Sequence, residues 1–295
     1  MELIEILRGS PAAFAAYAGV IGLLVGSFLN VVIHRLPRMM DAALALDCAL
    51  LANPDAAPPT APAYNLVTPR SACPACGAPI SALQNVPVIS WLVLRGRCAG
   101  CRAPISIRYP IVEAATGVLS AWVAWHFGWS WEAAVGLAVT WTLIALTGID
   151  LDTQHLPDVL TLPLMWLGIL AAATLGRGPA PLPVDLHSAV LGAAFGYLSL
   201  WTIYWGARLV TGREGMGYGD FKLLAALGAW LGWRMLLPIV LLSSLAGAVI
   251  GIAMILFRGH DRRVPIPFGP FLAAAGWLAM MFDAELIQPW WSLAR

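Results

Sequence analysis

The sequence predicts an all-α polytopic membrane protein, and three observations support this fold class. Of its 295 residues, 60% are hydrophobic and only 11% are charged, whereas about 25% of the residues of a soluble protein are charged. The mean hydropathy is +0.77, and apolar runs long enough to cross a bilayer recur along the chain. These values exclude a soluble single domain and a disordered chain. The net charge of +1 gives no reason to expect nucleic acid as a partner.

About eight transmembrane helices are expected, because a helix needs about 20 mostly apolar residues to cross the hydrocarbon. The first run follows Glu2 and Glu5 rather than a basic stretch and has no small-residue cleavage site, so we interpret it as a permanent anchor. The sixth run is short for a complete crossing. The runs lie at about 12–33, 111–131, 133–149, 159–176, 188–207, 221–233, 235–257 and 264–282.

The distribution of arginine and lysine predicts how these helices are oriented in the lipid bilayer. Basic residues concentrate in alternate loops, above all in the segment 34–110, and cytoplasmic loops carry such an excess. The N-terminus is therefore expected outside the cytoplasm. Three regions follow: a transmembrane anchor (1–33), a cytoplasmic loop (34–110) and a membrane domain of seven helices (111–295).

The first part of the cytoplasmic loop is of low complexity. The stretch from Ala42 to Ala63 is rich in alanine and proline, and we expect it to be irregular. Cys48 falls in this stretch, and we expect it to be an unpaired bystander.

The other four cysteines form two C-x-x-C pairs, Cys73–Cys76 and Cys98–Cys101. Two such pairs at this spacing predict a zinc ribbon, in which four thiolates complete a tetrahedron at ~2.3 Å and leave no open position for catalysis. Two disulfides are the alternative, although the expected cytoplasmic location disfavours them. A unit this small has little core, so a bound Zn²⁺ would supply much of its folding free energy.

Glycines next to both pairs fit the tight turns that such knuckles need. Gly77 follows the first pair and Gly100 lies inside the second.

Two clusters of carboxylates lie at the ends of apolar runs, on the face that the topology makes cytoplasmic. One is Gly148 to Asp158, and the other is Gly215 to Lys222. Ionisable groups at such positions are costly and are functional candidates by default. We expect Asp150 and Asp220 to form a pair that holds one proton. Its ionised member would activate water and its protonated member would stabilise the developing oxygen charge.

The glycines of the second cluster, Gly217 and Gly219, would let the backbone approach a substrate or adopt unusual conformations. Asp152 and Asp158 share the first cluster with Asp150 and are alternative partners for Asp220. The simpler reading is that these acids cap helices, and Asp158 after Pro157 is well placed to do so.

These motifs together resemble the type IV prepilin peptidases, the bifunctional leader peptidase/N-methyltransferases of type IV pili and type II secretion in Gram-negative bacteria. The resemblance covers essentially the whole chain. It rests on Gly26-Ser27-Phe28-Leu29-Asn30-Val31-Val32-Ile33-His34-Arg35-Leu36-Pro37, the two cysteine pairs, Arg108-Tyr109-Pro110 leading to Glu113, the block from Ile149-Asp150 to Pro157-Asp158, the block from Gly215 to Lys222, and Pro265-Ile266-Pro267-Phe268-Gly269-Pro270.

The resemblance implies an eight-span inner-membrane aspartic protease of the Gly-x-Gly-Asp type, whose two catalytic aspartates match Asp150 and Asp220. It implies cleavage of the basic leader of prepilins and pseudopilins after a glycine, at the cytoplasmic face. It also implies N-methylation of the new N-terminal residue with S-adenosylmethionine, an activity that the family links to the four-cysteine loop.

The site of methyl transfer is harder to infer from the residues. No Gly-x-Gly-x-x-Gly unit is present, so a Rossmann-type cradle for the methyl donor is not expected. Asn30, Arg35, Arg108 and Glu113 flank the loop at the membrane face and are candidates to line a cofactor or substrate site. The alternative is that the arginines snorkel to the membrane surface and that Glu113 is a helix-start acid.

Two other functions would use the same residues differently. A transporter would use Asp150 and Asp220 as a proton relay, but it would also show internal repeats and broken helices at the midplane, which the sequence does not suggest. A non-catalytic, zinc-bearing membrane scaffold would leave the glycine-rich acid motif without a purpose.

Overall fold

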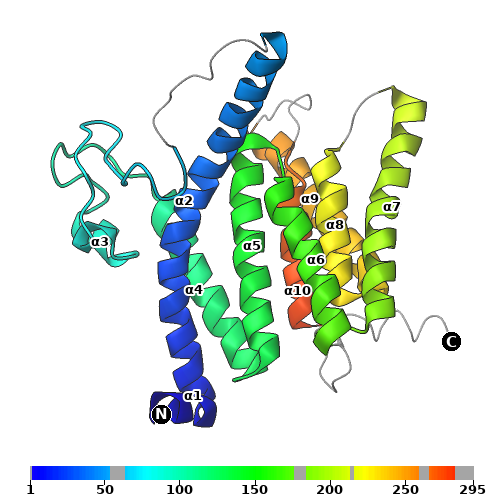
Figure 1. Cartoon of the computed structure of the whole chain (residues 1–295), viewed down its shortest axis with the longest axis horizontal. Helices are drawn as coiled ribbons and strands as arrows, with labels where there is room; N and C mark the ends of the chain where they lie inside the picture. Colours follow the sequence, from blue (N-terminus) through cyan, green and yellow to red (C-terminus); the bar gives the residue numbers. More distant parts are fainter. Residues whose placement is uncertain (1, 54–63, 176–183, 213–215, 259–265, 283–295) are drawn as a thin grey trace. The chain divides into compact units, whose positions relative to one another are not determined.

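The computed structural model describes residues 2–53, 64–175, 184–212, 216–258 and 266–282. The chain forms two compact units, Met1–Trp129 and Ser130–Arg295. Each predicted apolar run corresponds to a helix, which confirms the all-α fold class (Figure 1). Among the described residues, five helices are long and apolar enough to cross a membrane, and α10 is a shorter apolar helix.

The first unit consists of two long helices and a loop with little regular structure. Its elements are α1 (Glu2–Gly9), α2 (Pro11–Ala52), the 3-10 turn η1 (Leu83–Asn85), α3 (Ile89–Val93) and α4 (Arg108–Phe127).

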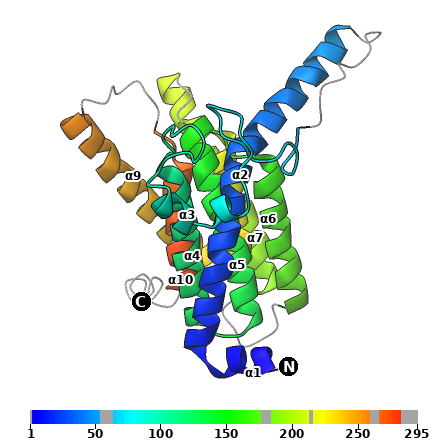
Figure 2. The ribbon, with the colours of Figure 1, turned by 90° about the vertical axis from the view of Figure 1, so that its left-hand side faces the viewer.

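Helix α2 is much longer than the predicted anchor. It begins with the Ser10 hydroxyl accepting the Ala13 N–H at 3.2 Å and continues to Ala52 without a break, with Pro37 inside it and a bend part-way along its length (Figures 1 and 2). The prediction of an irregular stretch from Ala42 was therefore wrong as far as Ala52, because alanine and leucine are strong helix formers. The helix ends at Asn53, which precedes a proline and so disfavours helical geometry. Residues 54–63 of that stretch lie outside the described residues.

Small residues bring α2 and α4 together. A Cβ atom at Gly22 would lie 2.5 Å from Ser120 Oγ, and one at Gly26 would lie 2.7 Å from the Cα of Glu113. Such close approach is typical of membrane helix pairs, which gain most from van der Waals contact. Helix α4 thus packs with α2 in the first unit, whereas the sequence grouped everything from residue 111 onward with the membrane domain.

The second unit is a bundle of six α-helices in its described residues. They are α5 (Trp131–Thr153), α6 (Asp158–Leu175), α7 (Leu186–Thr211), α8 (Tyr218–Leu231), α9 (Leu236–Arg258) and α10 (Gly269–Met281), with the 3-10 turn η2 (Trp233–Met235) before α9.

Helix α8 is short because it lies in the core of this bundle. Every residue from Asp220 to Leu231 except Lys222 is buried, and α6, α7 and α10 all pack against it. A Cβ atom on Gly192 of α7 would collide with the carbonyl oxygen of Gly228. A helix that is apolar on nearly all sides belongs in such an interior, and there it carries Asp220 with it.

Candidate active site and metal centre

Asp220 lies in the first turn of α8 and is 7% exposed. Its carboxyl group accepts the backbone N–H of Gly217, the N-cap residue. This is the return half of a capping box, in which an acid at the third helical position satisfies the N-cap amide. The expected capping role is therefore present, and it fixes the direction of the carboxylate.

The structure explains the need for glycine at one of the two glycine positions of this motif but not at the other. Neither adopts a positive φ, so the expectation of unusual backbone conformations was wrong. A Cβ atom at Gly219 would lie 2.7 Å from the Cβ of Leu156, whereas one at Gly217 would have room, with its nearest neighbour 3.8 Å away. The close approach of Leu156 therefore explains why residue 219 is a glycine, whereas no such contact is found at Gly217.

Asp150 lies in the last turn of α5 and is 4% exposed. Its Oδ2 accepts the backbone N–H of Gly269, the first residue of α10, at 3.0 Å. Just beyond Asp150, α5 ends in the left-handed residue Gln154, whose N–H donates to the Asp150 carbonyl. The carboxylate is thus fixed by one helix end and the start of another.

The fold brings Asp150 and Asp220 together from two different helices. The two carboxyl groups are buried and interact electrostatically. In a site with little water, such an interaction is stronger than it would be at the surface. Two buried carboxyl groups that interact in this way disfavour ionisation of both at once, which is the property that a general acid and a general base in one pair require.

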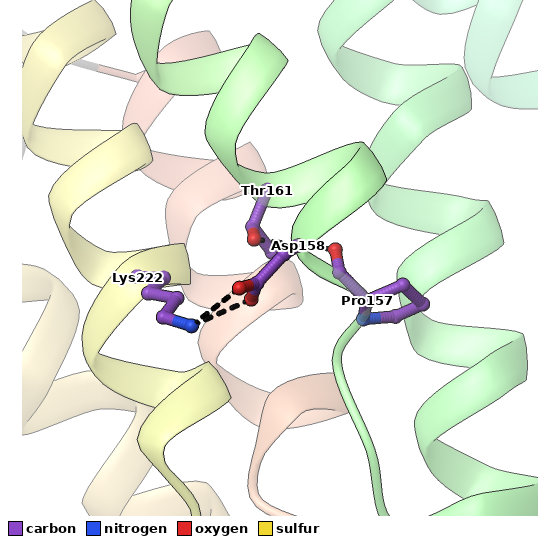
Figure 3. A network of polar contacts seen from close by, with 4 residues as sticks. All are labelled: Pro157, Asp158, Thr161 and Lys222. Carbon is purple, nitrogen blue, oxygen red and sulfur yellow. Dashed lines mark hydrogen bonds and ion pairs between the residues drawn. The ribbon is translucent and has the colours of Figure 1, made fainter. Parts of the chain in front are cut away.

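The two alternative acids lie elsewhere. Asp152 is exposed. Asp158 is the first residue of α6, and its carboxylate oxygens accept from the Lys222 ammonium at 2.6 and 2.7 Å (Figure 3). The Asp158 side chain is 52% exposed. The N-cap place belongs to Pro157, whose carbonyl accepts the N–H of Thr161, so Asp158 is an ion-pair partner rather than a cap.

Sequence reasoning missed two residues of this site, Leu156 and Gly269. Leu156, in the loop between α5 and α6, is 8% exposed and touches the Cα side of both Gly219 and Gly269. The motif around Gly269 was visible in the sequence as a proline-rich block, but nothing in that pattern indicated a bond to a residue 119 positions away. Pro265 and Gly215, at the edges of their motifs, lie outside the described residues.

The four predicted cysteines form one cluster in the first unit. Their sulfur atoms all lie within 4.8 Å of one another, and the Sγ atoms of Cys73 and Cys101 are 3.8 Å apart. A regular tetrahedron with ~2.3 Å metal–sulfur bonds has sulfur–sulfur edges of about 3.8 Å. The geometry fits a four-coordinate metal, and the 3.8 Å separation is far too long for a disulfide between those two residues.

The two knuckles are copies of one design, separated by 25 positions in each matching pair of residues. Cys73 N–H donates to the Ala78 carbonyl at 2.9 Å, and Cys98 N–H donates to the Ala103 carbonyl at 2.8 Å. The residue after each second cysteine is left-handed: Gly77 has φ +71° and Arg102 has φ +61°. Gly100 lies in the tight turn of the second knuckle, as expected, and the left-handed place that Gly77 takes in the first knuckle is taken by Arg102 in the second.

The local backbone prepares this cluster for a metal. N–H groups of Cys101 and Gly100 lower the pKa of Cys98 to about 6. The Ala103 N–H acts in the same direction on Cys101, but the neighbouring sulfurs, with Cys76 foremost, and partial burial raise the pKa of Cys101 to about 11. One thiolate therefore forms readily, and a divalent ion would displace the remaining protons.

The candidates for methyl transfer hold the loop against α2 and α4. Arg35 is 8% exposed and donates to the carbonyls of Asn65 at 2.9 Å and Pro69 at 2.7 Å. Glu113, also 8% exposed, accepts the Val88 N–H at 2.7 Å. Arg35 is thus not a snorkelling arginine, and Glu113 is more than a helix-start acid.

The remaining two candidates lie beside the same junction. Asn30 is buried and donates to the Tyr109 carbonyl at 3.1 Å. Arg108 is half-buried at the start of α4, where its backbone N–H donates to Ser106 Oγ at 3.3 Å.

Comparison with known proteins identifies the class to which these two units belong. Residues 20–127 match the family described as the bacterial peptidase A24 N-terminal domain, and residues 137–252 match the type IV leader peptidase family. No solved structure matches the chain.

Relatives with both parts cover essentially the whole chain. A prepilin leader peptidase/N-methyltransferase of Pseudomonas aeruginosa is 49% identical and covers 100% of this chain and 99% of its own length. Proteins with the same description from Aeromonas hydrophila (52%; 97% of each chain) and Dichelobacter nodosus (50%; 98% of each chain) are similar. The chain belongs to the type IV leader peptidase family.

Proposed function

We propose that this protein cleaves the basic leader of type IV prepilins and of pseudopilins after a glycine, and then N-methylates the new N-terminal residue with S-adenosylmethionine. The family and the description of the relatives support both activities. One observation carries the peptidase half: two buried carboxylates, Asp150 and Asp220, come from the ends of two helices and interact electrostatically.

The two aspartates divide the work of peptide hydrolysis. The ionised carboxylate takes a proton from water as the water oxygen attacks the peptide carbonyl carbon. The protonated carboxyl donates a hydrogen bond to the carbonyl oxygen, where negative charge develops. When the C–N bond breaks, the proton taken from water passes to the leaving amine. The pair again holds one proton, ready for the next leader.

In this proposal, the substrate reaches the enzyme within the membrane. A prepilin carries an apolar segment directly after its leader, so it would reach the bundle by diffusing in the bilayer. The distribution of basic residues in the loops favours an N-terminus outside and active sites at the cytoplasmic face of the bacterial inner membrane.

The first unit is assigned to methyl transfer. Zn²⁺ is the ion that best suits four thiolates in a tetrahedron, and with four protein ligands it would have a structural role. Arg35, Glu113 and Asn30 fix the backbone around the junction of loop and membrane helices. S-adenosylmethionine would supply the methyl group, and the new N-terminal amine would give up a proton in exchange for it.

The test is cleavage of a purified prepilin in proteoliposomes, scored by mass spectrometry with and without S-adenosylmethionine. Wild type should remove the leader and add one methyl group. Asp150→Asn and Asp220→Asn should both abolish cleavage, because an amide keeps the shape of the carboxyl but cannot exchange the proton. Each variant should still insert into the membrane and retain its metal.

The matched control is Asp185→Asn. Asp185 also starts a helix of the second unit, where its Oδ1 accepts the Ser188 N–H at 3.0 Å, and asparagine caps helices as well as aspartate does. This variant should cleave normally. Cleavage by Asp150→Asn, together with its loss in Asp158→Asn or Asp152→Asn, would move the dyad. No cleavage by any form, with the protein inserted and its metal bound, would return the choice to a transporter or a scaffold.

A further inference from the structure

The proline-rich block before α10 has no part in the two-aspartate mechanism, yet it ends inside that site. Helix α10 begins at Gly269, with Phe268 as its N-cap residue. Pro270 follows and has no N–H, while the N–H groups of Phe271 and Leu272 both donate to the Phe268 carbonyl. The Gly269 N–H differs from these two because it donates to a residue outside its own helix, Asp150, whose Oδ2 lies 3.0 Å away.

The space at Gly269 is too small for any side chain. A Cβ atom there would lie 2.6 Å from Asp150 Oδ2 and 3.1 Å from its Cγ, and 3.2 Å from a methyl carbon of Leu156. Gly269 is not among the described residues with positive φ. Glycine is therefore required here by the approach of the carboxylate, and not by the conformation of the backbone.

The same contacts link Gly269 to the second aspartate. Leu156 lies against both Gly269 and Gly219, and Gly219 directly precedes Asp220 in α8. One side chain thus separates the beginnings of α8 and α10. The spacing of these two helix starts fixes where each carboxylate lies relative to the other.

We propose that Gly269 is a positioning residue of the peptidase: its amide and its missing side chain hold the Asp150 carboxylate toward Asp220. This inference rests on the proposed function of the two aspartates. It adds the start of α10 as a third element of the site, beyond the residues 137–252 that match the peptidase family.

The test compares Gly269→Ala with Gly276→Ala in the full-length protein. Gly276 lies in the same helix and is also crowded, since a Cβ atom there would meet the flexible end of Leu227 at 2.5 Å, but it does not touch Asp150. Displacing a reacting group by about 1 Å can cost 100-fold in rate. We expect Gly269→Ala to lower kcat for leader cleavage by about 100-fold with KM unchanged, and Gly276→Ala to keep most of its kcat.

Folding is checked in each variant by its metal content and by methyl transfer to a pilin that has already been cleaved. If Gly269→Ala does not fold, Leu156→Ala replaces it: a lower kcat at constant KM supports the proposal, and an unchanged kcat overturns it. Equal losses in both glycine variants, or a raised KM with normal kcat in Gly269→Ala, would also overturn it. Asp150→Asn distinguishes a failure of this inference from a failure of the proposed function, because full activity of that variant would refute the pair of catalytic aspartates itself.

Discussion

The two units of this protein are held in their folded structures by different kinds of interaction. In the second unit, apolar helices pack so closely that glycines such as Gly192 and Gly228 meet backbone to backbone. In the first unit, residues 64–107 are mostly exposed and have only short helical turns and isolated β-bridges. A cysteine cluster and bonds from Arg35 to the backbone organise that loop instead. Packing therefore positions the carboxylates, while the cysteine cluster and polar contacts position the loop, and we expect that each unit can be disturbed without the other.

The strongest separation should come from removing the metal. Cys76→Ser combined with Cys101→Ser leaves two of the four ligands, too few for a closed tetrahedral site, and the loop has too small a core to fold without it. Methyl transfer to a cleaved pilin should fall below detection, whereas leader cleavage should stay near the wild-type rate. Metal analysis and the two assays on one preparation measure this.

Cys48→Ser is the control for that experiment, because Cys48 is exposed and lies outside the cluster. It should keep both activities and all of its metal. Undiminished methyl transfer by a metal-free double variant would show that the loop is ordered by something other than the ion.

The next effect concerns the helical unit alone. Gly192→Ala places a methyl group against the Gly228 carbonyl, which cannot move aside as a side chain could. Overpacking of this kind lowers the free energy of unfolding by about 1–3 kcal/mol. Thermal unfolding in detergent should therefore begin at a lower temperature and cleavage should decline, with the metal still bound. Gly206→Ala is the matched change, since that α7 position opens to free space and alanine favours the helix by up to about 1 kcal/mol. Equal melting of the two variants would refute close packing at Gly192.

The third effect tests the polar side of the comparison. Arg35→Lys replaces a two-pronged donor by a single ammonium group, which cannot reach both the Asn65 and Pro69 carbonyls as guanidinium does. Losing one charged hydrogen bond costs about 1.5–3 kcal/mol. Residues 64–70 should exchange their amide hydrogens faster and methyl transfer should fall severalfold, at constant cleavage. Arg38→Lys, one turn along α2 and exposed, should change neither quantity.

Much of this architecture could be read from the sequence because it depends on local pattern. Long apolar runs become helices wherever a membrane supplies the solvent, and paired C-x-x-C spacings bring four sulfurs together in one place. Both signals hold regardless of how the helices are arranged. The same reasoning placed Asp150 and Asp220 at helix ends on one face, and the fold brings those two carboxylates together.

What the sequence did not reveal depends on contacts between distant segments. The hydrogen bond from the Gly269 N–H to Asp150 forms only when α5 and α10 pack together. The packing of Leu156 against Gly219 and Gly269 likewise requires α8 and α10 to be in place. The pairing of Lys222 with Asp158 arises in the same way. One local effect was also missed because two signals competed: helix propensity outweighed low complexity up to Ala52. The left-handed conformation of Arg102 was not indicated by any sequence pattern.

The length of α2 has a mechanical consequence. Its 42 residues span about 63 Å at ~1.5 Å each, roughly twice the ~30 Å depth of the hydrocarbon. About half of this helix therefore exceeds what a single crossing needs. Pro37 lies inside it, where its missing N–H removes one helical hydrogen bond and favours a bend. A change in the direction of the helix can thus occur at this proline without a break in the helix itself.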